Sequence, residues 1–324
     1  MGFVPQQLAL FTSSTFGRSG AQVFFVISGF VIPYALQASG YRVRDYGRFL
    51  LKRLARLEPP YIAAICLSLL IAAYHTWVDG DRFPYSVPQV LVHLGYLNMF
   101  FRYEWISPVF WTLGVELQYY LAIGLLFPLL LHPKVFWSVV APLCILVANR
   151  HQREWWLILV WLPFFLLGIA AFHYRRRLIN GWVFAAAIVL PTVYALLASG
   201  RFTAFACAAT VIIIAKVPAS VTIHRPLVWL GTISYSLYLI HFAVGSVVGN
   251  AIVRTFPGTP PLMVVLVSLA GCLIAAWGFY RLVELPSIRF SKRIRYRAAP
   301  RTAKGPSGLN HAIEGSTVAA RESS

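Results

Sequence analysis

Ionisable side chains inside apolar runs are the first places where this sequence could do chemistry. Glu116 lies within the apolar run 110–120, and a carboxylate inside a membrane is costly enough to be a functional hypothesis by default. His241 closes the run 233–241, and imidazole can exchange a proton near neutral pH. We therefore take Glu116 and His241 as candidate catalytic residues, although each could instead be a structural side chain with a partner in the protein.

Polar neighbours of these two residues follow helical spacings. Ser234, Tyr238 and His241 lie four and three residues apart, so a helix would place them on one face. A polar stripe of this kind usually lines a cavity or a neighbouring membrane helix. Gln118 follows Glu116 by two residues, which predicts that it points to another face of its helix.

A basic segment, 48–56, precedes Glu58 and two prolines. Arginine makes bidentate contacts with phosphate, and Arg53 and Arg56, three residues apart, could share one helix face. We take Arg53, Arg56 and also Arg48 as candidate phosphate-binding residues. The alternative is that the segment only anchors a membrane span by the charge of its cytoplasmic flank.

Other familiar site patterns are missing from the sequence. It holds no phosphate-binding glycine loop, dinucleotide fingerprint, nucleophile elbow or metal-ligand spacing, so no metal is expected. Four cysteines are scattered through apolar runs without paired spacing. Ser28 and Gly29 lie in an aromatic run and are expected to let two helices pack closely.

The elements that must position these residues are membrane helices. Of the 324 residues, 59% are hydrophobic and only 12% are charged, and the mean hydropathy is +0.69. Such a chain predicts an all-α, polytopic transmembrane helical bundle, because a span needs about 20 mainly apolar residues. About nine spans are expected, at 21–38, 58–76, 112–131, 135–148, 155–172, 182–199, 202–216, 227–250 and 261–283.

Charge gives the bundle a predicted orientation. The net charge is +18, and if the segment 39–57 is cytoplasmic and the spans alternate, 21 of the 28 Lys and Arg residues lie inside. The basic residues flank apolar runs, which favours a membrane-lipid environment and no nucleic-acid partner. The C-terminus is then cytoplasmic, and residues 291–324 are expected to form a basic, disordered tail.

Five motifs in order resemble acyltransferase family 3, bacterial membrane O-acyltransferases that act on surface glycans. The first two are Val23-Phe24-Phe25-Val26-Ile27-Ser28-Gly29-Phe30 and the basic, proline-ended segment from Arg53 to Tyr61. The others are the span from Trp111 to Tyr120, the span from Ile233 to His241, and Tyr280-Arg281-Leu282-Val283-Glu284-Leu285-Pro286. The likeness covers about residues 16–290, and five motifs in order are specific although each is weak alone.

This resemblance implies an acyltransferase domain over 1–290 in the bacterial inner membrane. It implies acyl-CoA, with acetyl-CoA as the leading donor, and a polysaccharide, lipopolysaccharide or other glycolipid acceptor. The catalytic and phosphate-binding roles of Glu116, His241, Arg53 and Arg56 fit that chemistry. The family plan has ten spans with a functional Arg and His in the first, which the sequence does not match. We therefore expect a further span to be encoded upstream of Met1.

Two other readings remain open from the sequence. A non-enzymatic transporter of glycan or lipid would also carry a buried acid and a polar stripe. An inactive, truncated remnant of the enzyme would keep the motifs without the activity. The ordered motifs favour the enzyme, whereas the acceptor sugar, the acyl group and the oligomeric state cannot be deduced from them.

Overall fold

The computed structural model describes residues 15–80, 82–151, 154–218 and 220–296, and within them every regular element is a helix. The predicted tail beyond 296 and the segment before 15 lie outside the described residues. The helices in chain order are α2 Thr15–Ala38, η1 Val43–Asp45, α3 Tyr46–Asp79, α4 Val87–Leu94, α5 Trp111–Leu130, α6 Pro133–Val135, η2 Phe136–Val140, α7 Ala141–Arg150, α8 Ile158–Arg175, α9 Gly181–Ser199, α10 Arg201–Lys216, α11 Arg225–Thr255, α12 Pro261–Phe279, η3 Tyr280–Glu284 and α13 Leu285–Arg293.

Seven helices in the described part of the chain are long and apolar enough to cross a membrane. The all-α polytopic prediction is therefore confirmed, and helices occur at all nine predicted positions. The segments 135–148 and 202–216 are the exceptions to the span criterion: the first is broken into short helices, and α10 has only 16 residues. The structure thus supports seven spans by length and composition, compared with the nine predicted.

Proline explains the breaks in two helices. The wide π-helical turns η2 and η3 each end two residues before a proline, Pro142 and Pro286. Proline has no N–H to continue the backbone hydrogen bonds of an α-helix, and a π-turn is one way for the chain to accommodate the missing bond. The short helix α7 and the bend before α13 follow from these two residues.

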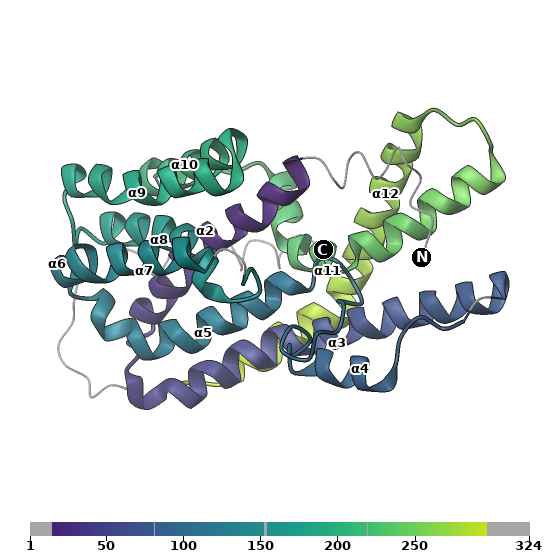
Figure 1. Ribbon diagram of the computed structural model, residues 1–324, viewed down its shortest axis with the longest axis horizontal. Coiled ribbons are helices and arrows are strands. Elements are labelled where there is room, and N and C mark those ends of the chain that lie inside the picture. The colour runs from purple at the N-terminus through teal and green to yellow at the C-terminus, as the bar shows by residue number, and fades with distance from the viewer. Residues whose placement is uncertain (1–14, 81, 152–153, 219, 297–324) are drawn as a thin grey trace.

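The helices form two packed groups (Figure 1). In one, α2 runs through the bundle and packs mainly on α8, with α5, α7, α9 and α10 around them. In the other, the α11–α12 hairpin packs against α3 and the outer segment around α4. Both groups include residues of α5, which places this helix, and Glu116 on it, between the two cores.

The close approach of α2 and α8 depends on two glycines. A Cβ atom on Gly168 would lie 2.0 Å from the carbonyl oxygen of Val26, and one on Gly29 would lie 2.3 Å from that of Phe165. Only hydrogen fits at either position, so the predicted packing role of Gly29 is confirmed. This crossing fixes Ser28, on the neighbouring position of α2, against the rest of the bundle.

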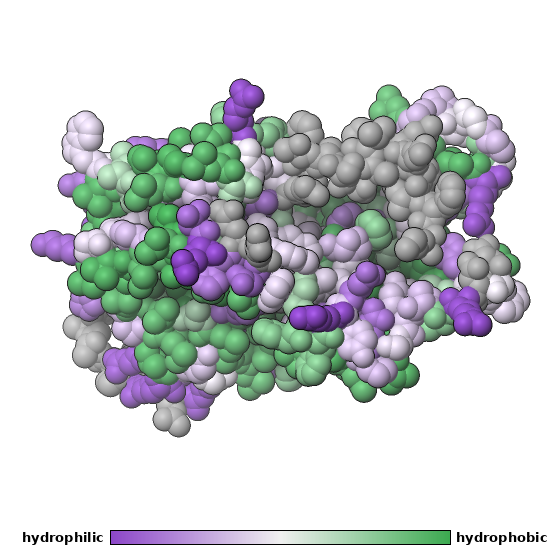
Figure 2. Space-filling view, in the orientation of Figure 1, coloured by the Kyte–Doolittle hydropathy of each residue, from purple (hydrophilic) through white to green (hydrophobic). Residues whose placement is uncertain are grey.

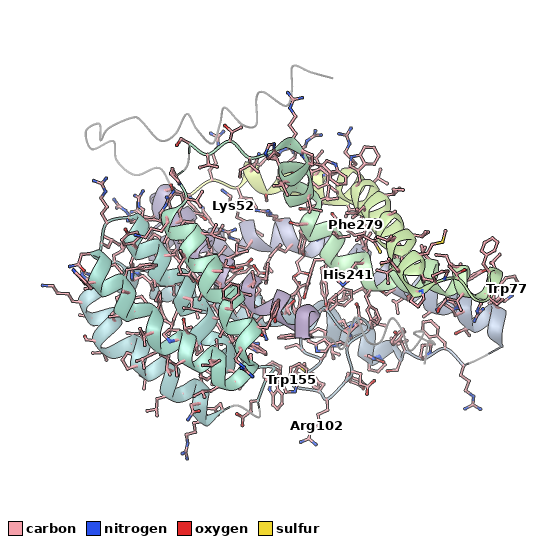
Figure 3. The ribbon with its side chains drawn as sticks, turned by 90° about the horizontal axis from the view of Figure 1, so that it is seen from above. Lys52, Trp77, Arg102, Trp155, His241 and Phe279 are labelled. Atoms are coloured by element: carbon pink, nitrogen blue, oxygen red, sulfur yellow. The ribbon has the colours of Figure 1, made fainter. Side chains whose placement is uncertain are left out.

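The molecular surface matches a membrane environment. Figure 2 shows broad hydrophobic areas over the bundle formed by α5–α10, where large side chains are exposed. In Figure 3, Lys52 of the predicted cytoplasmic segment lies on the side opposite Arg102, which belongs to a predicted outer segment. The orientation expected from charge stays a prediction.

Candidate active site

Glu116 is buried in the second turn of α5, between α2 and α3. Glu116 is only 5% exposed. One carboxylate oxygen, Oε1, accepts hydrogen bonds from the hydroxyl of Tyr120, one turn further along α5, and from Ser28 Oγ at 3.4 Å. Tyr120 and Ser28 therefore fix the orientation of the carboxylate from two different helices.

Two cationic side chains of α3 approach this carboxylate. The guanidinium of Arg53 lies over the rings of Tyr120 and Phe49, at 5.7 Å and 5.6 Å from their centroids. The charges of Arg53 and Arg56 both act on Glu116. The structure thus brings together three of the residues that the sequence analysis selected, with Arg53 half-buried and Arg56 exposed.

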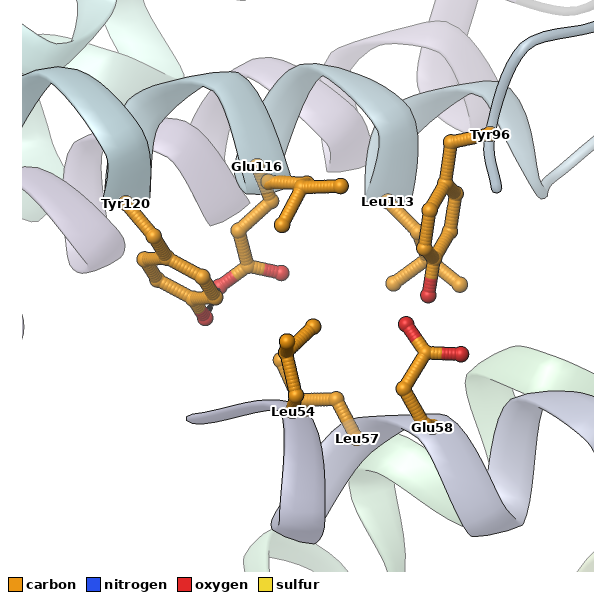
Figure 4. Close-up of a pocket in the computed structure, with 8 residues that line it drawn as sticks. Leu54, Leu57, Glu58, Tyr96, Leu113, Glu116 and Tyr120 are labelled. Atoms are coloured by element: carbon orange, nitrogen blue, oxygen red, sulfur yellow. Dashed lines mark hydrogen bonds between the residues drawn. The ribbon is translucent and has the colours of Figure 1, made fainter. Parts of the chain in front are cut away.

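A small pocket lies between α3 and α5 beside Glu116 (Figure 4). The space inside it, including the part open to solvent, is about 230 Å³. Four leucines form most of its wall, and the polar groups that reach it are two carboxylates and two phenols. The lining residues are Leu54, Leu57, Glu58, Tyr96, Leu113, Glu116, Leu117 and Tyr120.

Glu58 is a pocket residue that the sequence analysis did not select. The span predicted from the sequence begins at residue 58, which puts Glu58 at the end of that span. The structure corrects this, because α3 begins at Tyr46 and carries Glu58 in its interior. Helical spacing could not have found it, because Glu58 follows Arg53 by five residues and Arg56 by two, and neither spacing puts two side chains on one helix face.

Tyr96 enters the pocket from the outer segment and faces Glu58 (Figure 4). Its backbone has a positive φ of 55°, which is uncommon for an aromatic residue. Its ring stacks on that of Tyr61, with centroids 4.6 Å apart, and the Tyr61 hydroxyl donates a hydrogen bond to the carbonyl oxygen of His93 at 3.1 Å. No local sequence signal predicted this insertion, because it depends on contacts between α3 and the outer segment.

Glu284 is a further buried carboxylate near Arg56. It is 2% exposed in the π-turn η3, and its Oε2 accepts hydrogen bonds from the hydroxyl and the backbone N–H of Ser236, at 2.5 Å and 3.2 Å. The Arg56 charge acts on this carboxylate too. Glu58 and Glu284 thus lie, like Glu116, within the long apolar helices.

The predicted polar stripe of α11 is partly wrong. Ser234 is exposed and donates its hydrogen bond back to Gly231 within the same helix, whereas Ser236 is buried. Tyr238 does face the site: its hydroxyl donates to the carbonyl oxygen of Val109 at 2.9 Å and lies 2.5 Å from Thr112 Oγ1. Tyr238 therefore joins α11 to the start of α5.

His241 lies on α11 one turn beyond Tyr238 and outside the lining of the Glu116 pocket. Its Nδ1 is 2.9 Å from the carbonyl oxygen of Tyr238 and 3.1 Å from that of Leu237. These are contacts within its own helix. The structure does not place His241 in the lining of the pocket with Glu116, and its catalytic role stays a prediction.

Arg48 and Gln118 also have defined places. Arg48 Nη1 is 4.0 Å from Oδ1 of the buried Asp45 at the start of α3, two turns before Arg56. Gln118 faces away from Glu116, as predicted, and joins α5 to the start of α8: its amide donates to the carbonyl oxygen of Trp156 and its oxygen accepts from the N–H of Ile158, both at 2.9 Å.

Comparison with known proteins supplies the family. The family model described as an acyltransferase domain matches residues 2–281, nearly the whole chain. The chain belongs to this acyltransferase family. The match contains the helices that carry Ser28, Arg53, Arg56, Glu116 and Ser236, so the pocket lies within the family domain.

Two relatives show what the chain is similar to. O-acetyltransferase OatA of Staphylococcus aureus strain NCTC 8325 is 26% identical over 332 residues, covering 83% of this chain and 52% of the relative. BcsY of Komagataeibacter xylinus, named as a candidate membrane-bound transacylase, is 30% identical over 270 residues, covering 72% of this chain and 67% of the relative. The chain thus spans about half the length of the OatA relatives, and no solved structure gives a significant match.

Proposed function

We propose that the protein transfers an acetyl group from cytoplasmic acetyl-CoA to a hydroxyl of a cell-surface glycan or glycolipid sugar. The observation that carries this proposal is the placement of Arg53 and Arg56 near the buried Glu116, which lines a pocket between α3 and α5. Membership of the acyltransferase family and the name of the relative OatA support acyl transfer and the acetyl group. The inner membrane is the proposed location.

The chemistry requires a phosphate-binding group and a proton acceptor. In the proposed reaction the sugar oxygen attacks the thioester carbonyl carbon, a C–O bond forms, the C–S bond breaks, and the hydroxyl proton leaves with coenzyme A as its thiol. Arg53 and Arg56 bind the phosphates of the donor. Glu116 accepts a hydrogen bond or the proton from the attacking hydroxyl, oriented by Tyr120 and Ser28.

The donor site can be tested with charge-removing variants. We expect Arg53→Ala and Arg56→Ala to raise the apparent KM for acetyl-CoA about tenfold or more, because each removes a charge-assisted phosphate contact. The measurement is label transfer from radioactive acetyl-CoA to the glycan of isolated membranes, normalised to protein level. Lys134→Ala is the matched control, since Lys134 is an exposed cation of a predicted cytoplasmic turn, remote in sequence from α3.

Each result has a clear meaning. Unchanged acetyl-CoA dependence in the arginine variants would exclude their phosphate role. If wild-type membranes transfer no label to any glycan fraction, the proposed reaction itself is wrong.

A further inference from the structure

Glu58 opens onto the same pocket as Glu116 but lies at its opposite end. Figure 4 shows α3 and α5 running antiparallel past each other, with Tyr120 opposite Leu54 and Leu113 nearer to Glu58. Glu116 lies between these two ends. Arg53 lies over the ring of Tyr120, so the pocket has an arginine end next to Arg53 and a Glu58 end, with the buried Glu116 carboxylate between them.

The two ends face different parts of the molecule. Arg53 precedes Glu58 by five residues on α3, and five residues of α-helix advance roughly 7.5 Å. Glu58 lies next to Tyr96, which belongs to the segment between α4 and α5. The charge distribution of the sequence places that segment outside and the arginines inside. Glu58 is thus at the end of the pocket next to the outer segment, from which an extracytoplasmic acceptor would come.

Tyr96 is held so that its hydroxyl faces Glu58. An aromatic residue keeps a positive φ only where contacts with its surroundings hold it in that conformation. Tyr96 has such contacts, because it is buried and its ring stacks on Tyr61. The Tyr61 hydroxyl is in turn bonded to the outer segment at His93. This arrangement fixes the phenol as a donor beside a carboxylate that is itself half-buried.

We propose that Glu58, oriented by Tyr96, is the acceptor-binding group of this enzyme and selects a sugar with two neighbouring hydroxyls. The inference rests on the proposed function. Carboxylate oxygens accept hydrogen bonds, so Glu58 and Glu116, which both line the pocket, suit a ligand that brings two donors. A sugar diol has them: one hydroxyl binds Glu58 and its neighbour, next to Glu116, attacks the donor. The thioester group has no donor and does not fit between two carboxylates.

The test separates acceptor binding from donor binding. Membranes containing Glu58→Gln, Tyr96→Phe or wild-type protein are supplied with radioactive acetyl-CoA and with the cell's own glycan, from which ester groups have been removed by mild alkali. Glu58→Gln should raise the apparent KM for the glycan about tenfold or more while the KM for acetyl-CoA stays within twofold, because a charge-assisted hydrogen bond to the acceptor is lost. Tyr96→Phe keeps the stacked ring and should raise the glycan KM by a smaller factor.

The control is Glu104→Gln, the same substitution at an exposed residue of the outer segment, which should change neither constant. An unchanged glycan KM in Glu58→Gln, or an equal rise in both KM values, overturns the inference while leaving the donor site intact. If Glu58→Gln protein is lost from the membrane, Tyr96→Phe decides, and an unchanged glycan KM there overturns it as well. If the wild type transfers no label, the proposed function fails and this inference fails with it.

Discussion

At the scale of single residues, Glu116 stands out because groups from several helices orient its carboxylate. One carboxylate oxygen accepts hydrogen bonds from the hydroxyls of both Tyr120 and Ser28. The charges of Arg53 and Arg56 act on the same carboxylate. Burying an ionisable group costs free energy even when partners on three helices surround it, so such a group usually has a function. That cost is the physical reason to expect chemistry at Glu116.

Glu116→Gln should abolish acyl transfer and leave the fold intact. Glutamine has the same size and can still accept the hydrogen bonds of Tyr120 and Ser28, but it carries no negative charge and is no base. Label transfer from acetyl-CoA, measured at equal protein level, should fall by two orders of magnitude or more, about the contribution of general base catalysis. Near-normal transfer by this variant would mean that Glu116 only packs.

At the scale of elements, the α2–α8 crossing holds Ser28 against Glu116. A methyl group on Gly168 would overlap the backbone of Val26 and Phe30, and backbone cannot move aside as a flexible side chain can. We expect Gly168→Ala to destabilise the protein by about 3 kcal/mol or more, beyond the usual range for overpacking. The measurement is the thermal unfolding of detergent-solubilised protein.

Gly278→Ala is the matched control for that variant. It is a helical glycine whose added Cβ would meet nothing within 4 Å, and alanine is the better helix former. Its thermal stability should match or exceed that of the wild type. Equal stability of the two alanine variants would contradict the close helix crossing.

The outer segment that carries Tyr96 is stabilised by a neutral histidine. His93 is fully buried at the end of α4; its Nδ1 lies 2.7 Å from the carbonyl oxygen of Gln89 and its Nε2 accepts the N–H of Ile106 at 2.9 Å. These partners require a proton on Nδ1 alone. Burial lowers the pKa of His93 below its ordinary value of 6.5, against a smaller opposite effect of the Gln89 carbonyl.

This lowered pKa predicts acid sensitivity. Above pH 6.5 the ring is neutral in both the folded and the unfolded protein, so its contribution to stability is complete. As the pH falls through the folded-state pKa, the unfolded chain binds the proton more readily and that contribution is lost. The melting temperature should therefore fall between pH 7 and pH 5, and should fall less in His93→Gln. An equal fall in both proteins would exclude His93 as the cause.

At the scale of the whole molecule, charge decides the orientation of the bundle. With 21 of 28 basic residues on the predicted inner side, the segment 41–57 and the C-terminal end are expected in the cytoplasm. Reporter domains fused after residue 45 and after residue 295 should both give a cytoplasmic signal. An external signal from either fusion would reverse the assignment of the arginine end of the pocket to the donor.

The sequence by itself determined the all-α membrane class, the positions of the helices and the candidates Glu116, Arg53 and Arg56. These features are local, because each membrane helix satisfies its own backbone hydrogen bonds and can be recognised from the length of its apolar run. Only the tertiary structure decided that Glu58 and Tyr96 complete the pocket, and that His241 stays outside it. Those relations depend on how α3, α5 and the outer segment pack, and packing between residues distant in sequence leaves no periodic signal in the chain.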